Sequence, residues 1–282
     1  MADEVRFAAG LYRGTAAAYE RYRLPYPAAM IADLARSVQV CGRGRLLDLA
    51  CGTGQLALPL RRWFAEVWAV DQEPDMVEAV RAKAATAGAL NVQPVVSSAE
   101  ELGAQQEYFE MAVIGNAFHR LDRDLIARRI FGWLRPGGHL ALCWSSQPWI
   151  GEQGWQRALA AALDRWKAAL GAQQRIPAGW EQARLRRPDS QVLSDAGFEL
   201  GRSHELTIEH RWTLPELAGL IRSTSFLPAT VLGDQAAAFD ADLAASLGHH
   251  SDDGAFTETV SFIYHLARKP DSAAPPPHSD AA

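Results

Sequence analysis

The sequence has few cysteines, no long apolar run and no large excess of one charge. Its 282 residues include three cysteines, Cys41, Cys51 and Cys143, with neither C-x-x-C spacing nor a histidine pairing suited to zinc. We therefore expect no metal site and a reduced, cytoplasmic setting. No apolar stretch approaches the ~20 residues that cross a bilayer, and no apolar run follows a basic start. We expect neither a membrane segment nor a signal peptide.

The charge balance excludes another class of partner. The chain has 33 acidic and 28 basic residues and a net charge of −5. This balance gives no electrostatic reason to expect binding to nucleic acid or to an anionic membrane. Hydrophobic residues make up 48% and charged residues 22%, which is typical of globular proteins. The length suits one large α/β domain, or one core with a helical cap. The sequence gives no indication of oligomeric state.

Short apolar runs alternate with helical patterns through the first half of the chain. Runs buried on both faces are typical of parallel strands, and the alternation with helices indicates a doubly wound sheet. We predict an α/β fold with a doubly wound, mostly parallel seven-stranded sheet of Rossmann-like type and a helical cap. The predicted strands are residues 46–50, 67–70, 92–96, 111–114, 140–144, 199–209 and 259–266. The predicted helices lie within 8–38, broken at 24–27, and at 55–64, 76–87, 121–134, 191–196, 214–224 and 234–247.

This pattern divides the chain into five regions. After Trp144 the strand–helix rhythm breaks, and a tryptophan-bearing insertion follows before the rhythm resumes. The end of the chain is rich in proline and small residues, and we expect it to be disordered. The predicted regions are an N-terminal helical cover (1–40), a cofactor-binding half of the core (41–146), a helical lid insertion (147–187), a C-terminal part of the core (188–270) and a tail (271–282).

A glycine-rich loop follows the first predicted strand. It reads Leu47-Asp48-Leu49-Ala50-Cys51-Gly52-Thr53-Gly54, and its glycines let the backbone approach a ligand closely. The second predicted strand ends at Asp71, 17 residues past Gly54. An acid at this spacing is placed to accept hydrogen bonds from both ribose hydroxyls of an adenosine.

Two adenosine cofactors compete for this loop. Residues 52–57 also satisfy the G-x-G-x-x-A dinucleotide pattern, which is weak by itself. Asp48, at the edge of the loop, would repel a pyrophosphate but attract an ammonium group. S-adenosylmethionine carries an ammonium and a sulfonium and has no phosphate, so the electrostatics favour it over NAD.

Together with the loop, several further motifs carry a family resemblance. Residues 46–54, Val70-Asp71 with Met76, residues 97–102 and residues 134–138 resemble the class I S-adenosylmethionine-dependent methyltransferases over roughly residues 10–270. The segment 19–27, Tyr-Glu-Arg-Tyr-Arg-Leu-Pro-Tyr-Pro, is similar to the entry segment of the trans-aconitate-methyltransferase-like branch. In that branch, the resemblance implies, this segment folds over the cofactor.

The resemblance implies a cofactor site residue by residue. The methionine part would lie against Asp48, Ala50, Gly52 and Gly54, the ribose on Asp71, the adenine against Gln72, Met76, Ser98, Ala99 and Glu100, and the sulfonium side near Asn116. We expect Tyr22 and Arg23 to reach the cofactor carboxylate. Relatives usually carry glycine at position 50 and an acid at position 98. The alanine tightens the loop, and the serine accepts the adenine amino group more weakly.

The chemistry of the acceptor is less constrained. Methyl transfer from a sulfonium depends on alignment and on exclusion of water, and a protonated acceptor also needs a base. His119 lies at the carboxyl edge of the sheet and is the candidate base; the alternatives are a structural histidine and catalysis by proximity alone. The candidate acceptor-pocket residues are Tyr19, Trp144, Trp149, Trp155 and Trp212, each of which could instead pack in the core.

Three functions remain open at this stage. The first is methyl transfer to an O, N or C atom of a small molecule, such as a specialised metabolite. The others are a non-methyl rearrangement that keeps the same cofactor, and a cofactor-binding module without turnover. No Asn-Pro-Pro-aromatic motif follows the fourth strand, which argues against amino methylation of adenine in DNA or of glutamine. We also expect residues 147–187, with the N-terminal helices, to form a mobile lid, the alternative being a rigid wall.

Overall fold

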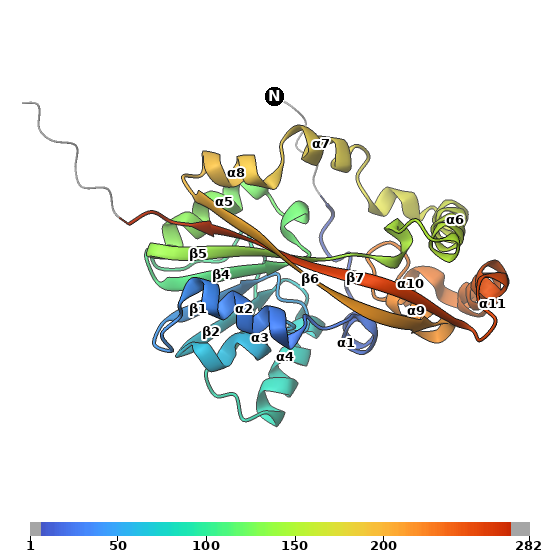
Figure 1. Cartoon of the computed structure of the whole chain (residues 1–282), viewed down its shortest axis with the longest axis horizontal. Helices are drawn as coiled ribbons and strands as arrows, with labels where there is room; N and C mark the ends of the chain where they lie inside the picture. Colours follow the sequence, from blue (N-terminus) through green and yellow to red (C-terminus); the bar gives the residue numbers. More distant parts are fainter. Residues whose placement is uncertain (1–6, 272–282) are drawn as a thin grey trace, which may run out of the picture.

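The apolar runs form one twisted sheet that crosses the whole molecule (Figure 1). The computed structural model describes residues 7–271. The strand order is β3-β2-β1-β4-β5-β7-β6, and only β7 runs antiparallel to its neighbours. The predicted doubly wound, mostly parallel seven-stranded sheet is therefore confirmed. The strands are β1 (Arg45–Leu49), β2 (Glu66–Asp71), β3 (Val92–Val96), β4 (Phe109–Gly115), β5 (Leu134–Ser145), β6 (Glu199–Thr213) and β7 (Ala255–Arg268).

Helices cover both faces of the sheet because its strands are apolar on both sides. In β1, Leu46 packs on one face with α2 (Ala28–Val38), α3 (Ala57–Leu60) and α4 (Pro74–Thr86). Leu47 points to the opposite face and packs with α5 (Arg123–Trp133) and α8 (Asp189–Asp195). This alternation follows the two-residue period of a strand. Neither face of β1 is left to solvent.

A third apolar cluster forms the helical cap. It joins α6, α9 and α11 to the distal halves of β6 and β7, with Trp212 and Phe256 at its centre. Figure 1 shows the paired strands β6 and β7 extending together from the sheet toward this group. The remaining helices are α1 (Ala16–Tyr22), α6 (Gly154–Ala169), α7 (Trp180–Arg186), α9 (Leu214–Arg222), α10 (Ala229–Leu232) and α11 (Ala236–Leu247).

The segment predicted to be a lid contains two different kinds of helix. α6 buries Trp155, Leu159 and Leu163 in the cap cluster, whereas no residue of α7 is buried. The N-terminal α1 also packs on the cap, where the Tyr22 ring lies against Gly219 of α9. The two helices thus differ in packing: α6 is buried in the cap, whereas α7 buries no residue. Whether either helix moves stays a prediction.

Some boundaries differ from the sequence prediction. The expected helix at 55–64 is one α-helical turn followed by a 3-10 turn, Arg61–Trp63, before buried Phe64 adopts an extended conformation. β5 begins at Leu134, before the Pro-Gly-Gly turn expected to precede it, because residues 135–138 bulge out of the ladder. The predicted disordered tail lies, apart from Asp271, outside the described residues. Within residues 7–271 no helix is long and apolar enough to cross a membrane.

Candidate functional site

The loop between β1 and α3 has the backbone conformation that its glycines permit. Gly52 and Gly54 have φ angles of 54° and 81°, in the left-handed region that glycine enters without steric cost. At Gly54 an added Cβ would lie 3.1 Å from Val80, so a side chain there would crowd α4. Ala50 has a φ of 57° although it carries a Cβ, which strains the backbone. Ala50 is the position where relatives usually have glycine.

Asp71, at the end of β2, fixes this loop from the side. One carboxylate oxygen accepts a hydrogen bond from the Gly52 N–H at 2.8 Å, and the other accepts from the Glu73 N–H at 2.9 Å. Burial raises the pKa of Asp71, and these backbone N–H groups oppose that shift. Each oxygen keeps a second lone pair. The carboxylate can thus hold the loop and still accept hydrogen bonds from a ligand.

A cavity of about 650 Å³ opens beside this carboxylate. It is lined by the carboxyl ends of the parallel strands and by the chain before α1, and its volume is typical of small-molecule sites. The structure brings ten of the predicted residues to its wall: Tyr19, Ala50, Gly52, Asp71, Gln72, Met76, Ser98, Ala99, Glu100 and Asn116. Wall residues that the sequence analysis did not propose are Phe7, Ala8, Ala9, Tyr12, Glu73, Val96, Ser97, Glu101, Gly115, Ala117, Arg120, Leu121 and Asp122.

One end of the cavity combines apolar and acidic groups. Met76 lies on its wall, and Val96 at the end of β3 is 51% exposed beside it. The Ser98 hydroxyl donates to Glu101 at 3.1 Å and accepts from the Glu101 N–H at 3.2 Å. Glu101 and Glu100 place carboxylates near the position where the sequence has serine instead of the usual acid. This end can therefore hold a flat apolar ring that carries an amino group.

Asn116 joins the ends of β4 and β5 next to the cavity. Its side-chain nitrogen donates to the Tyr26 hydroxyl and to Ser145 Oγ, both at 3.1 Å. Its side-chain oxygen accepts from the Ser145 N–H at 3.0 Å. Asn116 has a φ of 51°, a left-handed conformation that asparagine tolerates better than most residues. These hydrogen bonds hold the Asn116 side chain in one orientation at the edge of the cavity.

Asp48 lies beneath the loop and does not line the cavity. One of its oxygens accepts from the Ala57 N–H at 2.8 Å, and the other is buried without a hydrogen-bond partner. Burial raises the pKa of Asp48 to about 8. Gly54, likewise, is absent from the cavity wall and serves the turn.

Tyr22 and Arg23 also lie away from the cavity wall. Tyr22 packs against α9, and Arg23 Nε donates to Ser223 Oγ at 2.8 Å. The Arg23 guanidinium also lies 5.1 Å from the centre of the Tyr19 ring, which does line the cavity. Arg23 therefore connects the N-terminal segment to the cap.

His119 is enclosed by aromatic rings. Its ring centroid lies 5.1 Å from that of Trp180, 5.5 Å from that of Trp144 and 5.9 Å from that of Phe7. Burial, with the nearby charge of Arg120, lowers the pKa of His119 to about 3, and its Nδ1 has no hydrogen-bond partner. His119 does not line the cavity. A base this weak would take little of an acceptor's proton near neutral pH.

The four tryptophans proposed for the acceptor pocket are not on the cavity wall. Trp155 and Trp212 are buried in the cap cluster, and Trp212 donates to Glu258 at 2.7 Å. Trp149 packs edge-on against Phe226, and Trp144 lies under the Arg184 guanidinium. Along residues 7–271 no group of three or more His, Cys, Asp or Glu side chains is placed to hold a metal ion.

Comparison with known proteins identifies the central part of the chain. Residues 46–138 match the family described as the methyltransferase domain. An uncharacterized methyltransferase of Mycobacterium tuberculosis is 32% identical over 148 residues, 52% of this chain and 56% of that protein. A ubiquinone biosynthesis O-methyltransferase of Xanthomonas euvesicatoria is 33% identical over 100 residues, 35% of this chain and 41% of that protein. The chain thus spans about half the length of the curated relatives it matches.

Solved structures show the same fold over more of the chain. A putative methyltransferase from Bacillus halodurans superposes with a TM-score of 0.55 at 20% identity, covering 86% of this chain and 99% of that one. The [4+2]-cyclase SpnF superposes with a TM-score of 0.53 at 17% identity, covering 96% and 89%. At these identities the likeness concerns the fold alone. Residues 46–138 thus match a methyltransferase domain, a class whose cofactor is S-adenosylmethionine.

Proposed function

We propose that this chain, built on a methyltransferase domain, transfers a methyl group from S-adenosylmethionine to an O, N or C atom of a small molecule. The observation that carries the proposal is Asp71, a buried carboxylate at the end of β2 that borders both the glycine loop and the cavity. A carboxylate in this position suits the hydroxyls of a ribose. When bound, S-adenosylmethionine supplies an electrophilic methyl group on a sulfonium.

The residues present fit this cofactor. Val96 and Met76 give the adenine an apolar wall, and Ser98, Glu100 and Glu101 give its amino group acceptors. Ala50 and Gly52, from the glycine loop, also line the cavity, and the methionine part would lie against them. Asp48, which lies beneath the loop, would act indirectly, because its hydrogen bond from the Ala57 N–H holds the turn that carries Ala50 and Gly52. Asn116 would fix the edge of the site near the sulfonium.

The N-terminal segment would exclude water from the reaction. Asp75 of α4 accepts hydrogen bonds from the Gly14 N–H at 3.0 Å and the Ala16 N–H at 3.4 Å, which ties this segment over the cavity. Tyr12 and Tyr19 of the same segment line the wall. Of the segment 19–27, which carries the resemblance to the trans-aconitate-methyltransferase-like branch, Tyr19 alone lines the cavity. This arrangement leaves alignment and dehydration of the reactants as the main catalytic contributions.

No general base is needed in this proposal. Burial lowers the pKa of His119, which makes it a weak base, and raises that of Tyr19 to about 12, so that Tyr19 keeps its own proton near neutral pH. We propose that the chain acts by proximity on an acceptor that is already nucleophilic, and that the aromatic rings position His119 as part of the wall. A base role for His119 would require the Trp180 ring to move away.

The test is a screen of small-molecule acceptors with isotopically labelled S-adenosylmethionine, read by mass spectrometry. Label in a product, lost in Asp71→Asn, supports the proposal. A product that is rearranged and unlabelled would indicate the alternative enzyme class. Cofactor binding with no product from any acceptor would indicate a binding module, and calorimetric binding of NAD in place of S-adenosylmethionine would overturn the cofactor assignment.

A further inference from the structure

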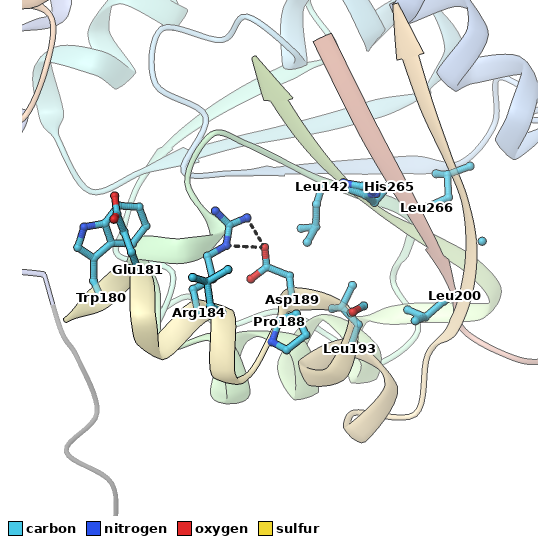
Figure 2. A pocket seen from close by; sticks show the side chains of 13 residues that line it. Leu142, Trp180, Glu181, Arg184, Pro188, Asp189, Leu193, Leu200, His265 and Leu266 are labelled. Atoms are coloured by element: carbon cyan, nitrogen blue, oxygen red, sulfur yellow. Dashed lines mark hydrogen bonds and ion pairs between the residues drawn. The ribbon is translucent and has the colours of Figure 1, made fainter. Parts of the chain in front are cut away.

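A second cavity lies between α7 and the sheet, away from the glycine loop. It has a volume of about 570 Å³, within the range of small-molecule sites. In Figure 2, side chains of α7 and α8 face Leu142 and His265 of the sheet across this space. We call it the α7 hollow; it is lined by Leu142, Trp180, Glu181, Arg184, Leu185, Pro188, Asp189, Ser190, Leu193, Leu200, Gly201, His265 and Leu266.

The lining of the hollow is mostly apolar, and part of it is exposed. Leu185 of α7 is 81% exposed and Leu200 of β6 is 48% exposed, although Leu142 and Leu193 are buried. Large exposed leucines cost free energy unless something covers them, at roughly 25 cal/mol per Å². Two of them facing one cavity mark a surface that an apolar molecule would cover.

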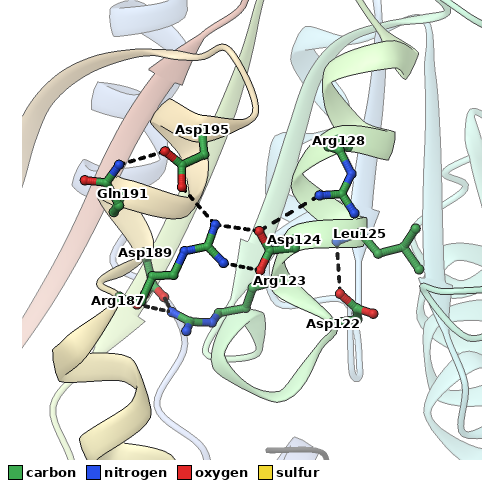
Figure 3. Close-up of polar contacts among 9 residues, drawn as sticks. All are labelled: Asp122, Arg123, Asp124, Leu125, Arg128, Arg187, Asp189, Gln191 and Asp195. Atoms are coloured by element: carbon green, nitrogen blue, oxygen red, sulfur yellow. Dashed lines mark hydrogen bonds and ion pairs between the residues drawn. The ribbon is translucent and has the colours of Figure 1, made fainter. Parts of the chain in front are cut away.

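Ion pairs, together with the ring contacts of Trp180 at its first residue, hold α7 above the hollow. Asp189 accepts from both Arg184 of α7 and Arg123 of α5 (Figures 2 and 3). Arg187, which ends α7, pairs with Asp124 of α5 and Asp195 of α8 (Figure 3). Because α7 has no buried residue, an occupant of the hollow would give it an apolar surface to pack on. Of the charged groups that line the hollow, Arg184 and Asp189 already pair with one another and do not require a charged ligand.

A wall of rings separates the hollow from the cofactor cavity. Trp180 lines the hollow and contacts His119 and Phe7, and Phe7 lines the cofactor cavity. On the other side of His119, Trp144 precedes Ser145, which is bonded to Asn116. The two cavities are therefore neighbours, with the contacting rings of Trp180 and Phe7 between them.

We propose that the α7 hollow binds the apolar part of the methyl acceptor, and that the acceptor is an amphiphilic molecule whose polar end reaches past Trp180 toward Asn116. This inference rests on the proposed function and names its substrate class. It explains why α7 is held by ion pairs at a distance from the sheet and why its Leu185 side chain is exposed. It also gives the cluster of His119, Trp144 and Trp180 a role as the passage between two binding sites.

The test uses 4-alkylphenols from ethyl to octyl, titrated calorimetrically into the full chain. Each added methylene is expected to raise the affinity about fourfold while the alkyl chain still fits. Leu185→Gln is expected to lower the affinity for 4-octylphenol at least about fourfold, the effect of one methylene. Ser190→Trp, at an exposed position on the rim, is expected to fill the space and abolish the dependence on chain length.

Leu90→Gln is the matched control, because Leu90 is 98% exposed and lies outside the hollow. It is expected to bind the series as the unmodified chain does. Affinity independent of chain length, or equal losses in Leu185→Gln and Leu90→Gln, would overturn the inference. The inference would also be overturned if acceptors that gain the label in the screen did not compete with 4-octylphenol for binding. Cofactor titration is separate: a chain that binds alkylphenols but no S-adenosylmethionine would retain the hollow and refute the proposed function.

Discussion

Replacing Asp71 by asparagine tests two roles of its carboxylate, holding the glycine loop and binding the ribose of the cofactor. Asparagine places an N–H₂ group where one carboxylate oxygen accepts from Gly52 or Glu73. Losing one charge-assisted hydrogen bond inside the protein costs about 1.5–3 kcal/mol of unfolding free energy. If Asp71 also binds the ribose, the loss of one similar bond weakens cofactor affinity about 10- to 100-fold. We therefore expect both stability and affinity to fall.

Urea unfolding measures the first effect, and calorimetry of S-adenosylmethionine binding measures the second under conditions where the variant is folded. Asp253→Asn is the control, since this carboxylate accepts from the Ala255 N–H at 3.1 Å in the loop before β7. It should change stability alone. If Asp71→Asn loses stability but keeps the original affinity, Asp71 serves only to hold the loop, and the proposed cofactor geometry is wrong.

The remaining predictions concern strain, ionisation and motion. Ala50→Gly relieves a left-handed alanine that costs about 1–2 kcal/mol, against about 0.5–1 kcal/mol of added chain entropy, so urea unfolding should show a gain of up to ~1.5 kcal/mol; a loss would contradict the strain. The raised pKa of Asp48 makes the chain lose stability as pH rises from about 4 to about 8, by at most ~1.4 kcal/mol per pH unit. Asp48→Asn, which keeps an acceptor for Ala57, should remove this slope in pH-dependent unfolding, and an unchanged slope would assign it to other groups. The lowered pKa of His119 acts in the opposite direction, because the unfolded chain binds the proton first, so stability falls as pH drops from about 6.5 to about 3. His119→Asn should reduce that acid loss and change turnover less than ~10-fold, whereas a fall of ~10²-fold would restore the base hypothesis. Hydrogen exchange in the free chain should be slow in α6 and fast in α7, and equal protection of both would refute the distinction drawn from their burial.

The sequence predicted the parts of the fold that depend on local patterns. Residues 92–96 form β3 as predicted, and the break at Pro25 and Pro27 separates α1 from α2. The glycine loop and Asp71 could be predicted together, because consecutive parallel strands end at the same edge of a sheet. Ten wall residues of the cavity follow from this edge or from the family resemblance.

The rest depends on contacts between distant segments. Phe7 and Tyr12 reach the cavity from irregular chain before α1, although helix was predicted from residue 8, and Arg120 follows a strand end where many orientations are open. In the sequence, Trp155 and Trp212 cannot be distinguished from tryptophans that face a ligand. Only the packing of α6 and α9 places them in the cap. His119 has the residue type of a base, but the rings around it come from three distant segments.

The long pairing of β6 with β7 has a mechanical consequence. The ladder runs from Glu199↔Arg268 in the sheet to Thr213↔Ala255 beside α9, without leaving its two strands. One stiff ribbon is thus anchored at both ends, by the core at one end and by the cap at the other. A movement of the cap away from the sheet must bend or shear this ribbon. The cap and the sheet are therefore mechanically coupled. The strain of any opening movement falls on the parts that the ribbon does not reach, α7 and the chain before α1.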